Sequence, residues 1–408
     1  MDHLRKHILF VVPFNPLLGS KGAQGPKNVS QPLIGLVAAA HEVILAVVSD
    51  DPTLSEAVLM AAFPQVRGVH ICRPVSGWAR RLWRLRFLLQ GLPPSLADSI
   101  AASLAALLRE QVPAHDLVHF EYFTLAPYIA AVQRHKPVAL HCHDAYSLYQ
   151  QRCLEEADGR RAKLLALLRR CLFQRLEGGA IASCAAAMTV SPVDQRYLAL
   201  AGLANVRYLP PALREVSMLV PPERHSQPVE LLCVVPATYQ PSQLRALRAL
   251  FREVLPGLAA RYPGQLSITL FGKTAARLQR ELPAIGTLQA VEFVDDYFGF
   301  LGSRNWVYLY PQRAGAGLHT KVRDAMTAEL PVVGYAEIMN AFSGHNWQHY
   351  VACDCDAAVG EALDKLFASA ALRRQIGLGG KALLAQRFGP AHVINSLNGI
   401  YAGVCNGE

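Results

Sequence analysis

The chain has 408 residues, a length that exceeds one ordinary hydrophobic core and predicts two domains. Apolar residues make up 52% of it and charged residues only 17%, which excludes a disordered chain. The formal net charge of +9 suits an anionic substrate, a membrane surface or nucleic acid, and does not choose among them. The nine cysteines have neither zinc-ligand nor small-scaffold disulfide spacing, so we expect reduced thiols in a cytoplasmic protein.

The first elements predict a βαβ unit. The apolar run Ile8 to Val12 lacks alternation, which is typical of a buried parallel strand, and it is too short for a signal peptide or a membrane span. A glycine-rich loop follows it and contains Gly19 and Gly22, but its glycines are spaced more widely than in the dinucleotide-binding fingerprint. A helix from about Gln31 to Ala40 and a strand from Val43 to Val48 would complete the unit.

Residues 76–92 combine two signals on one predicted helix. One face carries apolar side chains at helical spacing, and arginines stand on the other side: Trp78, Leu82, Leu85 and Leu89 against Arg80, Arg81 and Arg84. Aromatic residues with arginines on an amphipathic helix fit a membrane-surface anchor. The ordinary alternative is a helix that packs its apolar face on the core and leaves the arginines in water.

The rest of the first half predicts three more strands and a histidine pair. The strands are expected at 116–120, 137–140 and 187–190. His141-Cys142-His143-Asp144 lies where the second of them gives way to a loop. A pattern of this kind can hold a metal, but the sequence offers no further ligand cluster, so no metal site is expected.

The second half restarts after a linker at 219–229, which has three prolines and scattered charges. Strands are predicted at 231–235, 266–271 and 291–294, and Gly272-Lys273 closes the second. The remainder, from 357 to 388, has the periodicity of helices.

The most informative stretch is PQRAGAGLHTKVRDAMTAELPVVG, residues 311–334. A strand should end at Tyr310, a loop with Gly315 and Gly317 follows, and apolar residues then recur at helical spacing. Lys321 and Asp324 fall off that apolar face near the helix start. A glycine loop before a helix presents backbone N–H groups to an anion, and Lys321 would add a full charge. The alternative is a βαβ unit whose glycines only shape a turn.

These residues resemble the donor-site signature of GT-B glycosyltransferases, and they are closest to the large retaining family called glycosyltransferase family 4, in its Gly-x-Gly branch. The resemblance extends over nearly the whole chain. It implies an α/β GT-B fold, with two doubly wound, Rossmann-like domains facing across a cleft. The implied boundaries are an acceptor-side domain at 1–215, a nucleotide-sugar donor domain at 216–390 and a helix at 391–408 that crosses back toward the first domain.

The resemblance also implies the chemistry: transfer of a sugar from a nucleotide-diphosphate sugar, with retention of configuration. The acceptor would be a glycan, or a lipid-linked or envelope polysaccharide precursor. His143, with His141 a close rival, matches the histidine that lines the sugar pocket in the family. Lys321 and Asp324 complete the catalytic set that the resemblance implies. The implied substrate-binding residues are Gly19, Gly22, Lys273, Gly315, Gly317, Leu318, His319 and Thr320.

Two departures from the family pattern leave a second hypothesis open. The usual paired glutamates would align with Ala316 and Asp324, so the first is absent and the second is one methylene shorter. The alternative is therefore a glycosyltransferase-like subunit that binds a nucleotide sugar with little or no turnover. In either case we expect no cofactor and no metal, no nucleic-acid partner, and a cytoplasmic protein that associates with the inner face of an anionic membrane if residues 76–92 form an anchor.

Overall fold

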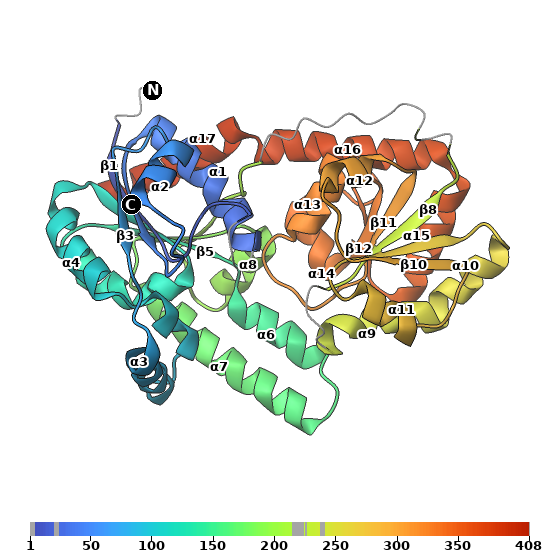
Figure 1. The fold of residues 1–408 in the computed structure, drawn as a ribbon, viewed down its shortest axis with the longest axis horizontal. Coiled ribbons are helices and arrows are strands. Elements are labelled where there is room, and N and C mark those ends of the chain that lie inside the picture. The colour runs from blue at the N-terminus through green and yellow to red at the C-terminus, as the bar shows by residue number, and fades with distance from the viewer. Residues whose placement is uncertain (1–4, 20–23, 214–223, 225–226, 237–240, 408) are drawn as a thin grey trace. The chain divides into compact units, whose positions relative to one another are not determined.

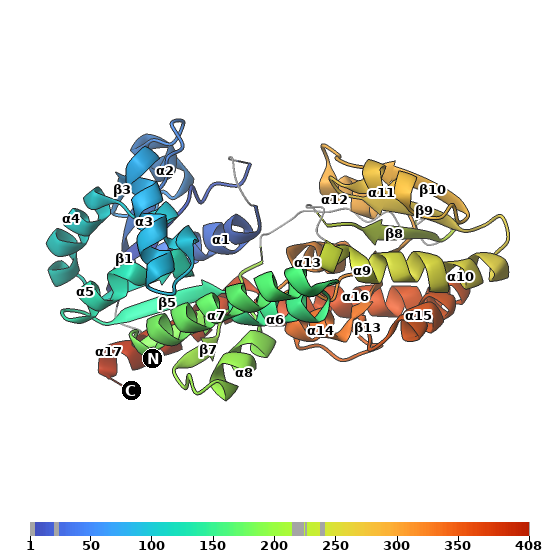
Figure 2. The same ribbon diagram turned by 90° about the horizontal axis from the view of Figure 1, so that it is seen from below.

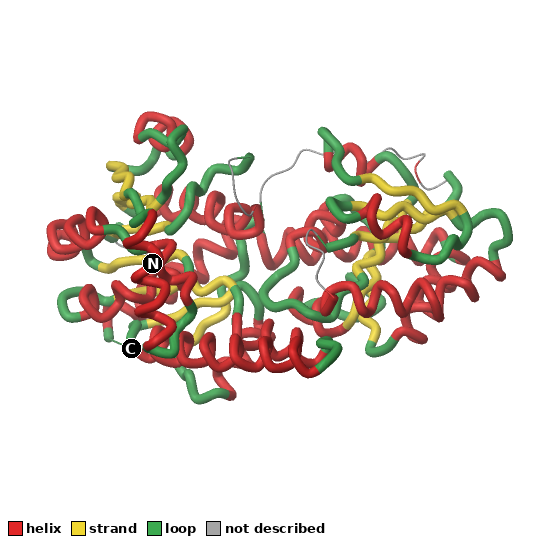
Figure 3. The backbone as a smooth tube through the Cα atoms, turned by 60° about the horizontal axis from the view of Figure 1, so that its bottom comes forward, coloured by secondary structure: helices red, strands yellow, loops and turns green. Residues whose placement is uncertain are grey.

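The structure is a computed structural model that describes residues 5–19, 24–213, 224, 227–236 and 241–407. The chain divides into two compact units. Unit 1 consists of Met1–Leu148, Leu168–Arg214 and Phe388–Glu408, and unit 2 consists of Tyr149–Leu167 and Glu215–Arg387. Each unit holds one parallel sheet surrounded by helices (Figure 3). Among the described residues, no helix is both long and apolar enough to span a bilayer.

The sheet of unit 1 has seven strands in the order β3-β2-β1-β4-β5-β6-β7. Their bounds are β1 His7–Val12, β2 Glu42–Val48, β3 Gly68–Cys72, β4 Leu117–Glu121, β5 Val138–His143, β6 Ala186–Thr189 and β7 Val206–Tyr208. Strand β1 is buried on both faces: Leu9 and Val11 pack in one core cluster, and Ile8 and Phe10 pack in another. Two-sided burial explains why this strand reads as a continuous apolar run.

Helices cover both faces of this sheet (Figure 1). Their bounds are α1 Gln24–Ala40, α2 Glu56–Ala62, α3 Gly77–Leu89, η1 Pro94–Ser99, α4 Ala102–Gln111, η2 Val112–Ala114, η3 Phe123–Tyr128, α5 Ile129–Gln133, α7 Arg160–Ala182, α8 Pro192–Leu200 and α17 Pro390–Asn406. The last helix, α17, buries Val393, Leu397 and Tyr401 in the same core cluster as Ile8 and Phe10, so the end of the chain completes unit 1.

The sheet of unit 2 has six parallel strands in the order β10-β9-β8-β11-β12-β13. Their bounds are β8 Glu230–Val234, β9 Ser267–Phe271, β10 Thr287–Val291, β11 Trp306–Tyr310, β12 Val332–Tyr335 and β13 Val351–Cys353. The helices are α6 Tyr146–Glu155, α9 Pro241–Ala249, the π-helical turn η5 Leu250–Val254, α10 Leu255–Arg261, α11 Ala275–Glu281, α12 Tyr297–Gly302, α13 Thr320–Thr327, α14 Ala336–Met339, η6 Asn340–Phe342, α15 Asp356–Ala368 and α16 Ala370–Phe388. Helix α9, η5 and α10 follow one another without a break (Figure 2).

The sequence predictions are wrong at three places in the fold. The third strand of unit 2 is β10 at Thr287–Val291, and the run 291–294 lies after it, with Phe293 exposed. β10 is an edge strand that pairs with β9, and because none of its residues is fully buried it gives a weak apolar signal. Helix α1 begins at Gln24, seven residues before the predicted start, because Pro32 lies inside it rather than at its first turn.

The third error concerns α3. The packing alternative placed the Trp78, Leu82, Leu85 and Leu89 stripe on the core, but these side chains are exposed, with Trp78 at 76% and Leu89 at 79%. The helix instead turns Trp83 and Phe87 toward the sheet. Two of its arginines are engaged by carboxylates: Arg80 lies 3.5 Å from Asp50 and Arg84 lies 2.9 Å from Asp98.

Candidate functional site

In unit 2, Lys321 lies at the carboxyl ends of two central strands. Its Nζ is 3.5 Å from the carbonyl oxygen of Val235, just after β8, and 5.8 Å from the ring centre of Phe271, the last residue of β9. Burial lowers the pKa of Lys321 to about 8, although Asp324 acts to raise it. Within the described residues, no carboxylate lies within salt-bridge distance of this ammonium. A mostly buried cation at strand ends is a favourable position for an anionic ligand.

The loop that precedes Lys321 depends on both of its glycines. Gly317 has a φ of +68°, a conformation that side chains rarely adopt. A Cβ on Gly315 would overlap the ring of His319, so this position has no room for a side chain. The Nδ1 atom of the same ring is hydrogen-bonded to the hydroxyl of Tyr310 at 2.8 Å. Burial lowers the pKa of His319 to about 4. The neutral imidazole of His319 therefore packs against the loop at Gly315.

The helix after the loop, α13, begins at Thr320 with no side-chain cap on its N-terminus. Val322, Ala325 and Met326 are buried, whereas Lys321 and Asp324 lie only partly exposed on the other side, as predicted. Leu318 is buried and Thr320 is half-buried. Uncapped N–H groups at this helix start carry a partial positive charge next to the Lys321 ammonium.

Asp324 has a neighbour that the sequence analysis did not weigh. Its Oδ1 accepts from the guanidinium of Arg323, the adjacent residue, at 3.0 Å, and both side chains are largely buried. Tyr297 and Tyr308 also lie close enough to Asp324 for its charge to help raise their pKa values, after the effect of burial. Asp324 and Arg323 therefore form a largely buried ion pair close to Tyr297 and Tyr308.

The remaining predicted binding residues are spread over both units. A Cβ on Gly272 would lie 3.5 Å from Lys321 Nζ, which places the loop containing Lys273 beside the ammonium, and Lys273 itself is exposed. In unit 1, Gly19 is exposed with a φ of +81°, and Gly22 lies outside the described residues.

In unit 1, His143 is held by a carboxylate that the sequence analysis did not select. Glu121, the last residue of β4, has no exposure and is surrounded by donors. Its Oε1 accepts from His143 Nε2 at 2.6 Å and from Ser30 Oγ at 2.7 Å. Its Oε2 accepts from His119 Nε2 at 2.8 Å and from His141 Nδ1 at 3.0 Å. We call these five residues the Glu121 cluster.

Charge and hydrogen bonding fix the protonation of the Glu121 cluster. Burial acts to raise the pKa of Glu121, but the surrounding histidines, His141 and His143 above all, outweigh it and leave that pKa well below its ordinary value. Burial lowers the pKa values of His119 and His143, so both rings are neutral near pH 7. Because an ionised carboxylate only accepts, each ring nitrogen that faces Glu121 carries the proton.

The proton positions follow along the chain of hydrogen bonds. Neutral His119 has its proton on Nε2, so its Nδ1 accepts from the hydroxyl of Tyr401 on α17, 2.7 Å away. Neutral His143 likewise has its proton on Nε2 and leaves Nδ1 as an acceptor. Tyr401, His119, Glu121 and His143 therefore form one hydrogen-bonded series that selects the His143 tautomer.

The backbone at His143 explains why the sequence left its position open. β5 pairs with β6 through a register shift between His141 and His143, and His143 has a φ of +62°. Both histidines reach Glu121 despite this irregularity. The signal that was available is the alternation of His119 and Glu121 on β4, which puts both side chains on the same face of the sheet.

His119, Glu121 and His141 also meet the geometric condition for a metal site, since one potential ligand atom of each lies within 4.8 Å of the others. No such cluster was predicted around His141 from the sequence. The contacts in the structure have hydrogen-bond lengths, and the second nitrogen of His119 is used by Tyr401. Hydrogen bonding accounts for the geometry, and the absence of a metal stays a prediction.

No family model matches the chain, and no curated protein sequence matches it. Solved structures match over nearly the whole length. HepE from Anabaena in complex with UDP is 12% identical with a TM-score of 0.64 and covers 97% of this chain and 100% of HepE. Another structure of HepE contains UDP-glucose. Sucrose-phosphate synthase from Thermosynechococcus elongatus is 14% identical with a TM-score of 0.66 and covers 99% of this chain and 100% of its own.

A third example is α,α-trehalose 6-phosphate synthase from Burkholderia multivorans, at 9% identity and a TM-score of 0.62 over 99% of this chain and 98% of its own. Together with the two parallel sheets, these likenesses confirm the predicted fold class: the chain has the α/β GT-B fold of glycosyltransferases. At these identities the comparison establishes the fold and leaves the reaction to the site residues.

Proposed function

We propose that this protein is a nucleotide-sugar-dependent glycosyltransferase that transfers a sugar with retention of configuration. The observation that carries the proposal is the Lys321 ammonium, which lies at the carboxyl ends of β8 and β9 with no carboxylate of the described residues in salt-bridge range. A nucleoside diphosphate supplies the negative charge that this position lacks. The GT-B fold, shared with HepE, whose structures contain UDP and UDP-glucose, supports the same ligand class.

The chemical difficulty in such a reaction is the departure of the nucleoside diphosphate, on which negative charge accumulates. Lys321 and the uncapped N–H groups at the start of α13, behind Gly317, are preorganised to stabilise that charge. Removing one such donor from an active site costs about 3 kcal/mol in barrier height in other enzymes. His319 and Thr320 lie at this helix start, and Lys273 is close enough in sequence to Gly272 to reach the same anion.

His143 would position the sugar from unit 1. The Glu121 cluster holds its imidazole neutral, with the proton on Nε2, so Nδ1 can accept a hydrogen bond from a sugar hydroxyl. Asp324 would bind donor hydroxyls from unit 2.

One observation favours the second candidate function, a nucleotide-sugar-binding subunit with little turnover. Asp324 already pairs with Arg323 at 3.0 Å, and it is one methylene shorter than the glutamate usual in the resembled family. A carboxylate that is both retracted and ion-paired has less freedom to follow a substrate hydroxyl into the transition state.

The test is a panel of UDP-, GDP- and ADP-sugars assayed for binding by calorimetry and for release of the nucleoside diphosphate. Binding with release that depends on Lys321 and His143 supports the transferase. Binding without release, with any acceptor, supports the subunit. Failure of every nucleoside diphosphate to bind would overturn both.

The acceptor is proposed to be lipid-linked or otherwise at a membrane, because α3 exposes an apolar stripe at a surface rich in arginine. In Figure 1, α3 projects from the rest of unit 1. Its Arg81 lies over the ring of Trp78, 5.5 Å from the centroid, so charge and apolar area occupy the same patch. We expect peripheral binding to anionic bilayers, to which each basic residue near the surface adds about 1 kcal/mol.

Sedimentation with anionic vesicles at low salt tests this part. Trp78→Ser with Leu89→Ser should reduce sedimentation at least fivefold. Leu200→Ser on α8 is the matched control, because Leu200 is as exposed, at 81%, and lies on another helix. Wild-type protein that stays in the supernatant would remove the membrane proposal and leave the transferase proposal intact.

A further inference from the structure

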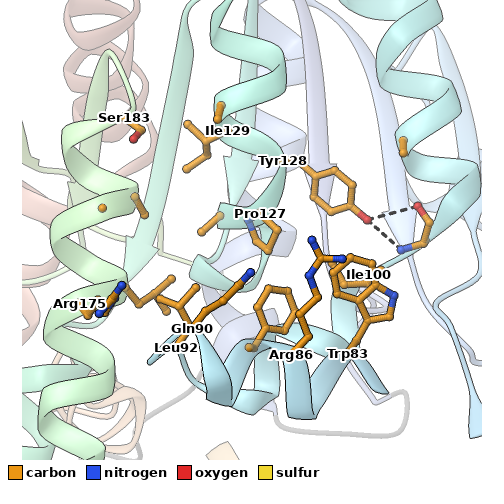
Figure 4. Close-up of a pocket in the computed structure, with 18 of the residues that line it drawn as sticks. Trp83, Arg86, Gln90, Leu92, Ile100, Pro127, Tyr128, Ile129, Arg175 and Ser183 are labelled. Atoms are coloured by element: carbon orange, nitrogen blue, oxygen red, sulfur yellow. Dashed lines mark hydrogen bonds between the residues drawn. The ribbon is translucent and has the colours of Figure 1, made fainter. Parts of the chain in front are cut away.

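Unit 1 contains a cavity that the proposed reaction does not use. It has a volume of about 610 Å³, and four segments form most of its walls: the second half of α3 with the loop after it, residues 100–105, residues 126–130, and residues 175–183 at the end of α7 (Figure 4). Ligand-binding pockets in proteins have volumes of about 300–1,000 Å³, so this cavity is large enough for a small molecule.

Small side chains create this cavity. The lining includes six alanines and one glycine, which are Ala101, Ala102, Ala105, Ala126, Ala130, Ala180 and Gly179. Between them lie the larger apolar groups of Phe87, Leu92 and Ile129. The hydroxyl of Tyr128 accepts from the backbone N–H of Ala101 at 2.8 Å, so the phenol is already engaged and leaves its ring to the cavity (Figure 4). The floor of the cavity is therefore apolar.

The charge of the cavity has one sign. Its lining contains two guanidinium groups, Arg86 and Arg175, and no carboxylate. Arg86 lies over the ring of Trp83, 4.8 Å from its centroid. Arg175 lies beside the turn that follows α3, where a Cβ on Gly91 would be 3.3 Å from its guanidinium. Neither has a carboxylate of the described residues in salt-bridge range, whereas Arg84, also on α3, is paired with Asp98.

We propose that this cavity binds a long-chain alkyl or isoprenoid phosphate, with the hydrocarbon chain against the alanine-lined floor and the phosphate at Arg86 and Arg175. Apolar walls bury the chain, and guanidinium groups are the side chains best suited to phosphate oxygens. The exposed apolar stripe of α3 continues from the cavity wall, which gives a ligand drawn from a bilayer a route along the same helix. Because the lipid would anchor the acceptor of the transferred sugar, this inference rests on the proposed function.

The direct test measures binding of decyl phosphate below its micellar concentration by calorimetry, with no nucleotide sugar present. Inorganic phosphate and decanol are the two partial probes, because the first has only the phosphate group and the second has only the hydrocarbon chain. The expected result is saturable, one-to-one binding of decyl phosphate, at least tenfold weaker binding of decanol, and none of inorganic phosphate. Binding of inorganic phosphate alone, or equal affinity for decanol and decyl phosphate, would contradict the proposed head-group site.

Two pairs of variants locate the ligand. Gly179→Phe places a ring in the cavity, and Gly178→Phe is its control on the same helix; a Cβ at either position meets no atom within 4 Å, and only Gly179 lines the cavity. Gly179→Phe should abolish binding and Gly178→Phe should not. The double variant Arg86→Gln with Arg175→Gln should lower the affinity for decyl phosphate at least tenfold. The double variant Arg81→Gln with Arg84→Gln should change this affinity less than twofold.

Each other outcome has a defined meaning. If wild-type protein does not bind decyl phosphate, the inference is wrong, whether or not sugar transfer occurs. If Gly179→Phe instead dissolves a dimer seen in sedimentation equilibrium, the occupant is a second copy of the chain and the lipid proposal is overturned. If decyl phosphate binds but no nucleoside diphosphate does, the lipid site stands and the transferase proposal fails.

Discussion

Replacing Glu121 with glutamine tests the Glu121 cluster. The carboxylate accepts four hydrogen bonds, from His119, His141, His143 and Ser30. A carboxamide has one oxygen, which can accept two of them, and its NH₂ group must face the other two donors. Hydrogen bonds to a charged group stabilise a fold by about 1.5–3 kcal/mol each, so the loss of two should cost about 3 kcal/mol. For a unit of this size, that lowers the melting temperature by roughly 6–12 °C.

The pH dependence gives the prediction its sign. The pKa of Glu121 is lowered in the fold, so its contribution is present above its unfolded pKa, near 4.5, and is lost as the pH falls through the lower folded value. The pKa values of His119 and His143 are also lowered, so unfolding takes up protons below about pH 6.5. Each of these histidines should therefore reduce wild-type stability by up to about 1.4 kcal/mol per pH unit below 6.5.

Urea unfolding from pH 7.5 to pH 5, monitored by circular dichroism, measures both effects. Glu177→Gln is the matched control, because Glu177 is also buried and bonded to Ser147, but burial raises its pKa to about 7. Since Glu177 is largely protonated at pH 6, an amide should replace it at a cost below about 1 kcal/mol. If Glu121→Gln is no less stable than Glu177→Gln at pH 6, the assigned ionisation of the cluster is wrong.

Three further predictions concern unit 2. Because burial lowers the pKa of Lys321 to about 8, the affinity for a nucleoside diphosphate, measured by calorimetry, should fall about tenfold per pH unit above 8. The Lys321→Ala variant should bind at least tenfold more weakly at pH 7 and should lack this pH dependence. A variant with unchanged affinity would exclude the phosphate contact. Asp324→Asn should impair the use of a nucleotide-sugar donor far more than the binding of the free diphosphate, and Asp324→Glu should raise turnover if the missing methylene limits it. An equal loss of affinity for both ligands would indicate a structural carboxylate. Gly315→Ala should destabilise unit 2 by about 1–3 kcal/mol in urea, since its Cβ overlaps His319, whereas Gly399→Ala, which meets open space, should be neutral or stabilising.

The sequence predicted most of the sheet framework because parallel strands buried on both faces leave continuous apolar runs. β1 and β11 were identified in this way, and the helix of Lys321 and Asp324 was identified from apolar residues at helical spacing. Edge strand β10 was misplaced, since none of its residues is fully buried and it leaves no continuous apolar run. The orientation of α3 was open for a different reason: two apolar stripes, one with Trp78 and one with Trp83, compete for the core on one helix.

In unit 2, the predicted site depended on residues that are adjacent in sequence. The glycine loop and Lys321 are contiguous, so their spacing carried the prediction. The Glu121 cluster draws Ser30 from α1, two residues from β4, two from β5 and a further donor, Tyr401, from α17. A hydrogen bond between residues 282 positions apart leaves no local pattern, and it becomes visible only once the helix is placed against the sheet.

The position of α17 has a consequence for how the protein is made. Synthesis on the ribosome proceeds from the N-terminus, and domains usually fold as they emerge. Here the seven-stranded sheet is complete at Tyr208, but Val393, Leu397 and Tyr401 arrive only after the whole of unit 2 has been translated. Until then, Ile8 and Phe10 lack their covering helix, and the His119 ring lacks the hydroxyl that sets its tautomer. The nascent first unit must therefore keep this apolar face uncovered until α17 has been translated, which lengthens the interval in which it is exposed to aggregation.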